Sequence, residues 1–63
     1  MTDQINIFDK LRCLERELRM RRQCYPGFIA RGRMDEKQAR REIAVLEAII
    51  ADYRELSREQ QLI

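Results

Sequence analysis

Residues 39–53 read ARREIAVLEAIIADY, and this stretch decides the fold. Apolar side chains recur in it after four, three, four and three residues, at Ala39, Ile43, Leu46, Ile50 and Tyr53. That heptad spacing predicts an α-helix with one apolar stripe facing a partner helix. Val45, Ile49 and Leu56 add a second column beside the stripe, so that large apolar side chains cover an arc of about 160°. One antiparallel helix covers less than that arc.

The helix that contains this stretch is expected to run over about residues 35–58. Asp35 is a good N-cap, and Glu36 in the first turn favours the helix dipole. A second helix is expected over about residues 3–24, starting near Thr2, Asp3 or Asn6. Its apolar seam has the same heptad spacing, interrupted only at Arg21, through Ile7, Leu11, Leu14, Leu18, Tyr25 and Phe28.

The connector between the two helices is expected over residues 25–34. Pro26 disfavours helix at the residue before it, yet proline is well suited to the first position of a new helix. Residues 26–31 are therefore expected to form one short helical turn of their own. Gly32 is expected to end that turn, since glycine is the usual residue beyond a helix C-terminus.

The fold class expected from these elements is all-α, a single domain over residues 1–63 built as a coiled-coil-like antiparallel two-helix hairpin. A chain of 63 residues buries only about 60% of its unfolded surface, so its own core is marginal. Together with the broad apolar arc, this predicts a homodimer that forms a four-helix bundle. The alternative is a lone hairpin whose second column stays exposed until it meets another protein.

The charge of the chain is distributed unevenly. The net charge is +2, but residues 10–41 hold eleven Lys and Arg against four Asp and Glu, a net +7. Seven basic residues are expected near the turn end as a site for an anion or a partner: Arg19, Arg22, Arg31, Arg33, Lys37, Arg40 and Arg41. Nucleic-acid phosphates or an acidic protein surface would suit such a site. The alternatives are a solvated rim neutralised by acids such as Glu15 and Glu17, or contact with the acidic ends of another hairpin.

Two polar residues fall within the apolar surfaces of the predicted helices. Arg21 lies in the seam of the first helix, and Glu42 lies within the apolar arc of the second. An antiparallel hairpin brings them close, so they are either an ion pair that fixes the register or two side chains that reach solvent separately.

Cys13 and Cys24 lie on one stripe of the first helix, about 16 Å apart along its axis, which is too far for a mutual disulfide. The preferred interpretation is two small, partly buried apolar residues at a helix contact. The alternative is a reactive thiol pair or a bridge between molecules.

Several function classes are not expected. There is no histidine to act as a base near neutral pH, and no phosphate-binding loop or nucleophile motif, so we expect no enzyme. Two cysteines without histidine do not make a zinc site, and no cofactor is expected. The longest nearly apolar run, residues 43–51, is far below the roughly 20 residues of a membrane span. Without a targeting signal, we expect a cytoplasmic protein with no membrane contact.

The sequence resembles a group of short phage and prophage proteins. The motifs that carry this resemblance lie within residues 14–53 and are LRMRR at 18–22, YP at 25–26, GRM at 32–34, Ala39, and EIAVLEAI at 42–49. The resemblance implies a phage-derived protein acting in a bacterial cytoplasm, and it implies no catalytic residues.

The first hypothesis is a small protein-binding adaptor or inhibitor. It would dock the column of Val45, Ile49 and Leu56, or its basic end, on a host or phage protein. The second is a helical dimer that binds nucleic acid through its basic ends. The third is a purely structural assembly subunit.

Overall fold

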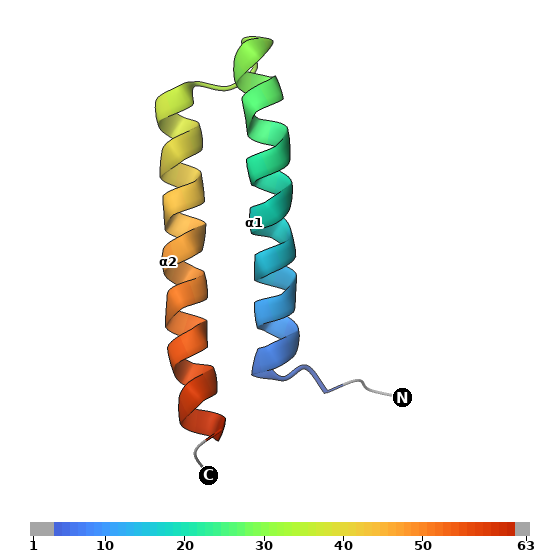
Figure 1. The fold of residues 1–63 in the computed structure, drawn as a ribbon, viewed down its shortest axis with the longest axis vertical. Helices are drawn as coiled ribbons and strands as arrows, with labels where there is room; N and C mark the ends of the chain where they lie inside the picture. Colours follow the sequence, from blue (N-terminus) through green and yellow to red (C-terminus); the bar gives the residue numbers. More distant parts are fainter. Residues whose placement is uncertain (1–3, 62–63) are drawn as a thin grey trace.

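The computed structural model describes residues 4–61 of the chain, and these residues form two α-helices. Helix α1 spans Ile7–Ala30 and helix α2 spans Glu36–Gln61. The helices run antiparallel and side by side, joined by a short connector at one end (Figure 1). The predicted all-α antiparallel hairpin is confirmed, and no strand occurs within residues 4–61.

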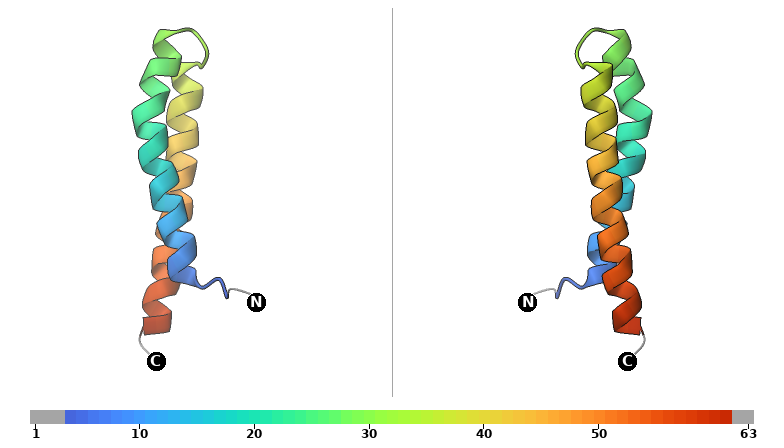
Figure 2. Two further views of the ribbon diagram at one scale, coloured as in Figure 1. Left: turned by 90° about the vertical axis from the view of Figure 1, so that its right-hand side faces the viewer. Right: turned by 90° about the vertical axis from the view of Figure 1, so that its left-hand side faces the viewer.

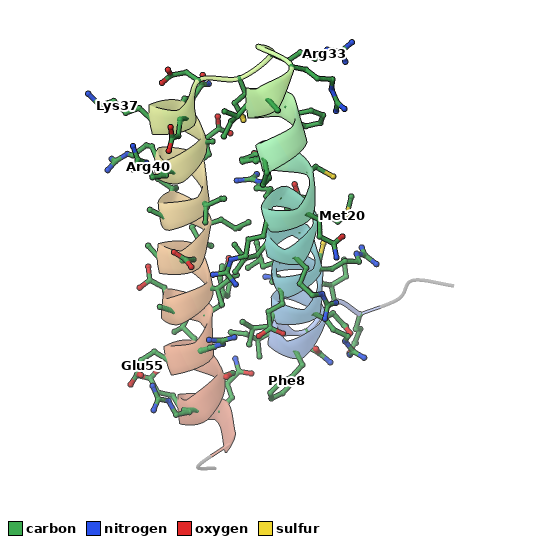
Figure 3. The ribbon with its side chains drawn as sticks, turned by 45° about the horizontal axis from the view of Figure 1, so that its top comes forward. Phe8, Met20, Arg33, Lys37, Arg40 and Glu55 are labelled. Carbon is green, nitrogen blue, oxygen red and sulfur yellow. The ribbon has the colours of Figure 1, made fainter. Side chains whose placement is uncertain are left out.

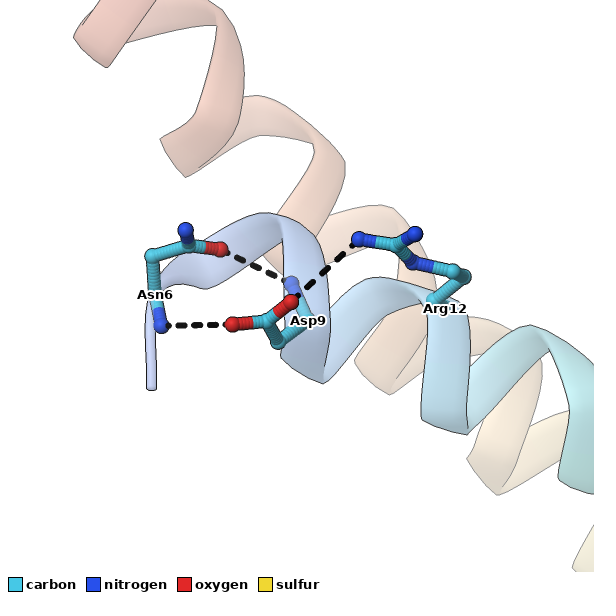
Figure 4. A network of polar contacts seen from close by, with 3 residues as sticks. All are labelled: Asn6, Asp9 and Arg12. Atoms are coloured by element: carbon cyan, nitrogen blue, oxygen red, sulfur yellow. Dashed lines mark hydrogen bonds and ion pairs between the residues drawn. The ribbon is translucent and has the colours of Figure 1, made fainter. Parts of the chain in front are cut away.

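The start of α1 is fixed by a capping box. The side chain of Asn6 accepts a hydrogen bond from the amide of Asp9 at 2.9 Å, and the Asp9 carboxylate accepts one from the amide of Asn6 at 3.2 Å (Figure 4). Two otherwise unpaired amides of the first turn are thereby satisfied. Asn6, one of three predicted N-caps, is therefore the cap, and α1 starts at residue 7 rather than near residue 3. The other two, Thr2 and Asp3, lie outside the described residues.

The end of α1 differs from the prediction, because the helix continues through Pro26 to Ala30. Proline removes one amide donor from a helix, but its fixed φ is compatible with helical geometry. Helical bonding is present again directly afterwards, where the amide of Arg31 donates to the carbonyl of Gly27 at 3.1 Å. The separate turn predicted over residues 26–31 is therefore wrong: residues 26–30 continue α1, and the connector comprises only residues 31–35.

Gly32 follows the end of a helix as predicted, but the helix that it ends is α1 and not a separate turn. Its φ of +72° lies in the left-handed region that glycine adopts without strain. Its amide donates to the carbonyl of Ile29 at 3.0 Å, and the amide of Arg33 donates to the carbonyl of Phe28 at 2.8 Å. This pair of bonds is a Schellman motif, which satisfies two carbonyls at the helix end.

The start of α2 is capped by Asp35, as predicted. The Asp35 carboxylate accepts a hydrogen bond from the amide of Gln38 at 3.2 Å. Its main-chain carbonyl accepts the first helical bond, from the amide of Ala39 at 2.9 Å. Helix α2 extends to Gln61, the last described residue, which is three residues beyond the predicted end.

The core is a thin seam between the two helices. Leu11, Leu46 and Ile50 form its centre, and three half-buried side chains pack against them: Leu14, Leu18 and Tyr53. All six belong to the predicted heptad stripes. No side chain within the described residues is less than 2% exposed. Each helix therefore has one neighbour only, and the molecule is a single layer two helices wide (Figure 2).

The shape of the hairpin is correspondingly extended. Its principal extents are 47 × 28 × 13 Å and its radius of gyration is 14.9 Å. A compact domain of this length has a radius of gyration of about 10–11 Å. The fold thus leaves most of each helix surface in contact with solvent.

Candidate interaction surfaces

Three apolar side chains of α2 are exposed along one line. Val45, Ile49 and Leu56 are 43%, 38% and 48% exposed, respectively. They are the second column identified in the sequence, and α1 leaves all three accessible. We call them the apolar column.

The apolar column and the ion pairs that join the helices lie on opposite sides of α2. Glu15 accepts from Arg54 at 2.7 Å, and Glu47 pairs with Arg22 across the helix interface. At 100° per residue, Glu47 and Arg54 lie about 140–200° around α2 from the apolar column. One broad face of the hairpin is therefore bridged by charged side chains, and the other carries the apolar column.

Arg21 and Glu42 meet at the turn end of this second face, but not as the predicted ion pair. Arg21 Nη1 donates to the main-chain carbonyl of Glu42 at 3.2 Å, and Arg21 Nε donates to the carboxylate of Glu17 at 3.2 Å. The ion pair of Arg21 is thus within α1. An arginine that enters the seam reaches the backbone of the facing helix first, which explains the difference.

The carboxylate of Glu42 has other partners. It accepts from Gln38 Nε2 at 3.1 Å and from the Tyr25 hydroxyl at 3.4 Å. Burial raises the pKa of the Tyr25 phenol above its usual value of 10.0; the charge of Arg21 opposes this shift, and Glu42 adds to it. Sequence reasoning missed Tyr25 as a partner, although a tyrosine in a heptad seam needs a polar neighbour for its hydroxyl.

The basic end of the hairpin contains fewer free cations than the sequence suggested. Arg22 is paired with Glu47. Arg19 lies on the outer surface of α1, in a shallow hollow that is also lined by Arg12 and Arg16. It is about 18 Å along the helix from Arg31. Neither Arg22 nor Arg19 therefore belongs to an unpaired cluster at the turn.

Five of the seven predicted basic residues remain at the turn, and we call them the basic tip: Arg31, Arg33, Lys37, Arg40 and Arg41. Within residues 4–61 the structure has five ion pairs, and none uses a residue of the basic tip. Lys37 and Arg40 point away from α1, and Arg33 projects from the connector at the same end (Figure 3). Acidic side chains thus neutralise Arg21 and Arg22, but they do not neutralise the residues of the basic tip.

Aromatic side chains lie directly below the basic tip. The Arg31 guanidinium is 5.7 Å from the centre of the Phe28 ring, a cation–π distance. The rings of Phe28 and Tyr25 are 6.3 Å apart and tilted by 40°. A ligand that stacks on Phe28 therefore competes with Arg31 for the face of the ring.

The interpretation of the two cysteines as partly buried is wrong. Cys13 and Cys24 are both free and exposed. Both positions lie about 100–130° around α1 from its apolar seam, on a side that α2 does not cover. Met20, on the same side, is 51% exposed and points away from α2 (Figure 3). Sequence reasoning gave too little weight to this angular distance.

Neither described helix has a stretch that is long and apolar enough to cross a bilayer. Comparison of the chain with protein-family models, with curated proteins and with solved structures gave no match. The interaction surfaces are therefore interpreted from their own chemistry.

Proposed function

We propose that this chain is a non-enzymatic protein-binding module that uses the apolar column to contact another helix. The observation that carries the proposal is the alignment of Val45, Ile49 and Leu56, all more than a third exposed, on a face where no ion pair of the described residues bridges the helices. A line of apolar side chains on one side of a rigid helix is the usual means of helix-to-helix recognition. Apolar surface of this kind marks interaction sites.

The biological setting is also part of the proposal. The resemblance to short phage and prophage proteins supports an adaptor or inhibitor of a host or phage protein in a bacterial cytoplasm. Such a role requires binding alone, which agrees with the first hypothesis from the sequence.

A capture experiment with matched variants tests this function. Tagged wild-type chain should retain a protein partner, either another protein or an untagged copy of this chain, at high salt, because apolar contacts are not screened by ions. Ile49→Asp should abolish retention. Ala51→Asp is the control, since it adds the same charge two residues along α2, about 140° around the helix from Leu56. Equal retention by wild type and Ile49→Asp contradicts the proposal.

The basic tip favours a second candidate function, binding of nucleic acid. Its five cations have no carboxylate partner within residues 4–61, so they are available to phosphates. Affinity for duplex DNA or single-stranded RNA should then fall steeply with added salt. Arg31→Glu/Arg33→Glu/Arg40→Glu should lose binding. Arg12→Glu/Arg16→Glu/Arg19→Glu changes the net charge equally on the outer surface of α1, and it should retain binding.

A further inference from the structure

We infer that the protein bound by the apolar column is a second copy of this chain. In this assembly the two α2 helices run antiparallel across a two-fold axis that passes between Ile49 and Asp52, and the two hairpins form a four-helix bundle. The inference rests on the proposed function, because it takes the apolar column to be a protein-binding face and names the occupant.

The first support is the amount of exposed surface. The chain exposes 5465 Å² at a mass of 7.7 kDa. A compact monomer of that mass exposes about 4,300 Å², so the hairpin has a surplus of about 1,100 Å². A standard stable interface removes about 800 Å² from each partner. One copy therefore has enough surplus surface to form such an interface.

The second support is the spacing of residues along the exposed face. Five positions follow a heptad alternation of three and four residues: Glu42, Val45, Ile49, Asp52 and Leu56. This is a second seam beside the buried one, and a heptad seam fits another helix that coils along its length. Helix α2 of another copy is such a helix. Pairing like with like also gives the self-complementary contact of a two-fold dimer.

The third support is that the unpaired charges of α2 differ between its two ends. Its beginning carries Lys37, Arg40 and Arg41 against Glu36 and Glu42, a net charge of +1, and none of these five residues has an ion-pair partner within the described residues. At its end, Arg54 and Arg58 are paired with Glu15 and Glu55, respectively. The acidic residues left at that end are Asp52 and Glu59.

The antiparallel orientation follows from this polarity. It brings the basic beginning of each α2 beside the acidic end of the other, whereas a parallel orientation brings like charges together. With the axis between Ile49 and Asp52, Arg41 of one copy lies at the height of Glu59 of the other. Both residues are about 60° from the middle of the apolar column, on the same side, where flanking charges meet across an interface.

The mass of the protein in solution tests whether a second copy covers the apolar column. Sedimentation equilibrium of the wild-type chain should give twice the monomer mass, Ile49→Asp should give the monomer mass, and Ala51→Asp should remain dimeric. A wild-type monomer, or a dimer that Ile49→Asp leaves intact, overturns the inference. Helicity measured by circular dichroism shows whether Ile49→Asp is still folded. If Ile49→Asp is unfolded, the variant Val45→Ser/Leu56→Ser takes its place, and it should also give the monomer mass.

Cross-linking tests the orientation in a Cys13→Ser/Cys24→Ser background, where each added thiol is the only one. Asp52→Cys should cross-link rapidly with a short bis-maleimide, because the two positions are offset by only about 4–5 Å along the helices. Glu59→Cys should not cross-link, because its two positions lie about 25 Å apart. Equal cross-linking at both positions indicates parallel helices and overturns the antiparallel arrangement.

The mass and capture experiments together separate this inference from the proposed function. A monomeric wild type whose capture of another protein is lost in Ile49→Asp, but not in Ala51→Asp, overturns the second copy and supports the proposed function. If Ile49→Asp changes neither mass nor capture, both are overturned.

Discussion

Arg21 of α1 donates a hydrogen bond to the main-chain carbonyl of Glu42 in α2, and the Glu42 carboxylate takes no part in that bond. The carboxylate instead accepts from Gln38 and Tyr25. The contact that joins the two helices at this height therefore depends on the side chain of Arg21 and on the backbone of its partner. Replacing the side chain of Glu42 leaves the acceptor in place.

A double-mutant cycle tests this relationship. Arg21→Ala should lower the free energy of unfolding by about 1 kcal/mol, the usual contribution of one partly buried hydrogen bond. The loss should be the same in a Glu42→Ala background, to within about 0.5 kcal/mol, because the carbonyl acceptor remains. Urea denaturation measures both values. Arg19→Ala, at an exposed position, is the control and should have little effect. A coupling well above about 1 kcal/mol contradicts the backbone contact and indicates a side-chain ion pair.

The Tyr25 phenol makes stability depend on pH in the alkaline range. Burial raises the pKa of Tyr25 in the folded chain above 10.0, so folding favours the protonated phenol. This contribution is fully present below pH 10 and is lost as the pH rises through the higher pKa of the folded state. Ultraviolet absorbance titration should show one tyrosine that ionises above the usual range. Tyr25→Phe should remove that transition, and its persistence in the variant contradicts the assignment.

Pro26 lies inside α1, where it interrupts the ladder of helical hydrogen bonds. Replacing it with alanine restores an amide that can donate to the carbonyl of Arg22. Pro26→Ala should therefore stabilise the chain by about 1–3 kcal/mol, within the helix-propensity difference between the two residues. Thermal unfolding followed by circular dichroism measures the change. A lower melting temperature in Pro26→Ala contradicts a helix that is continuous through this position.

At Gly32, in contrast to Pro26, substitution by alanine should be unfavourable, because the φ of +72° excludes most side chains. Gly32→Ala should destabilise the chain by about 1–2 kcal/mol, the cost of the left-handed conformation for an L-residue. Beyond the two neighbouring residues, no described heavy atom lies within 4 Å of the added Cβ, so the effect measures the cost of the backbone conformation alone. Gly32→Asn should cost less, since asparagine tolerates this conformation. Equal stability of wild type and Gly32→Ala in urea denaturation contradicts the Schellman ending of α1.

The features that were predictable from the sequence depend on neighbouring residues. Asn6, Asp35 and Gly32 act through hydrogen bonds to residues a few positions away, so residue type and spacing suffice to identify them. Pro26 misled the prediction because the cost of proline in a helix is offset by contacts that the continued helix makes between residues on both sides of it. Continuing α1 keeps Phe28 stacked against Arg31 and Tyr25.

The polar contacts across the seam were predictable only in part. Heptad spacing brings Arg21 and Glu42 to the same height, but it does not determine whether the arginine reaches the carboxylate or the carbonyl. That choice depends on the depth of each side chain in the seam and on competitors such as Glu17 and Tyr25. For the basic tip the same applies, since only the structure separates paired Arg22 from its unpaired neighbours.

Asp52 opposes association at the centre of the proposed α2 interface. It occupies a heptad position between Ile49 and Leu56, close to the inferred two-fold axis, where the carboxylates of two copies approach each other. A polar residue in such a seam selects one register at a cost in stability. Asp52→Leu should therefore tighten the dimer about tenfold or more, and each tenfold change corresponds to about 1.4 kcal/mol.

Sedimentation over a range of concentrations measures this dissociation constant. Glu55→Leu is the matched control, because it also removes one carboxylate from an exposed position of α2. It lies about 100° around the helix from Leu56, away from the column, and should leave the constant nearly unchanged. Added salt should narrow the difference between wild type and Asp52→Leu, because ions screen the repulsion between the two carboxylates. An unchanged or weaker dimer in Asp52→Leu contradicts a two-fold axis next to this residue.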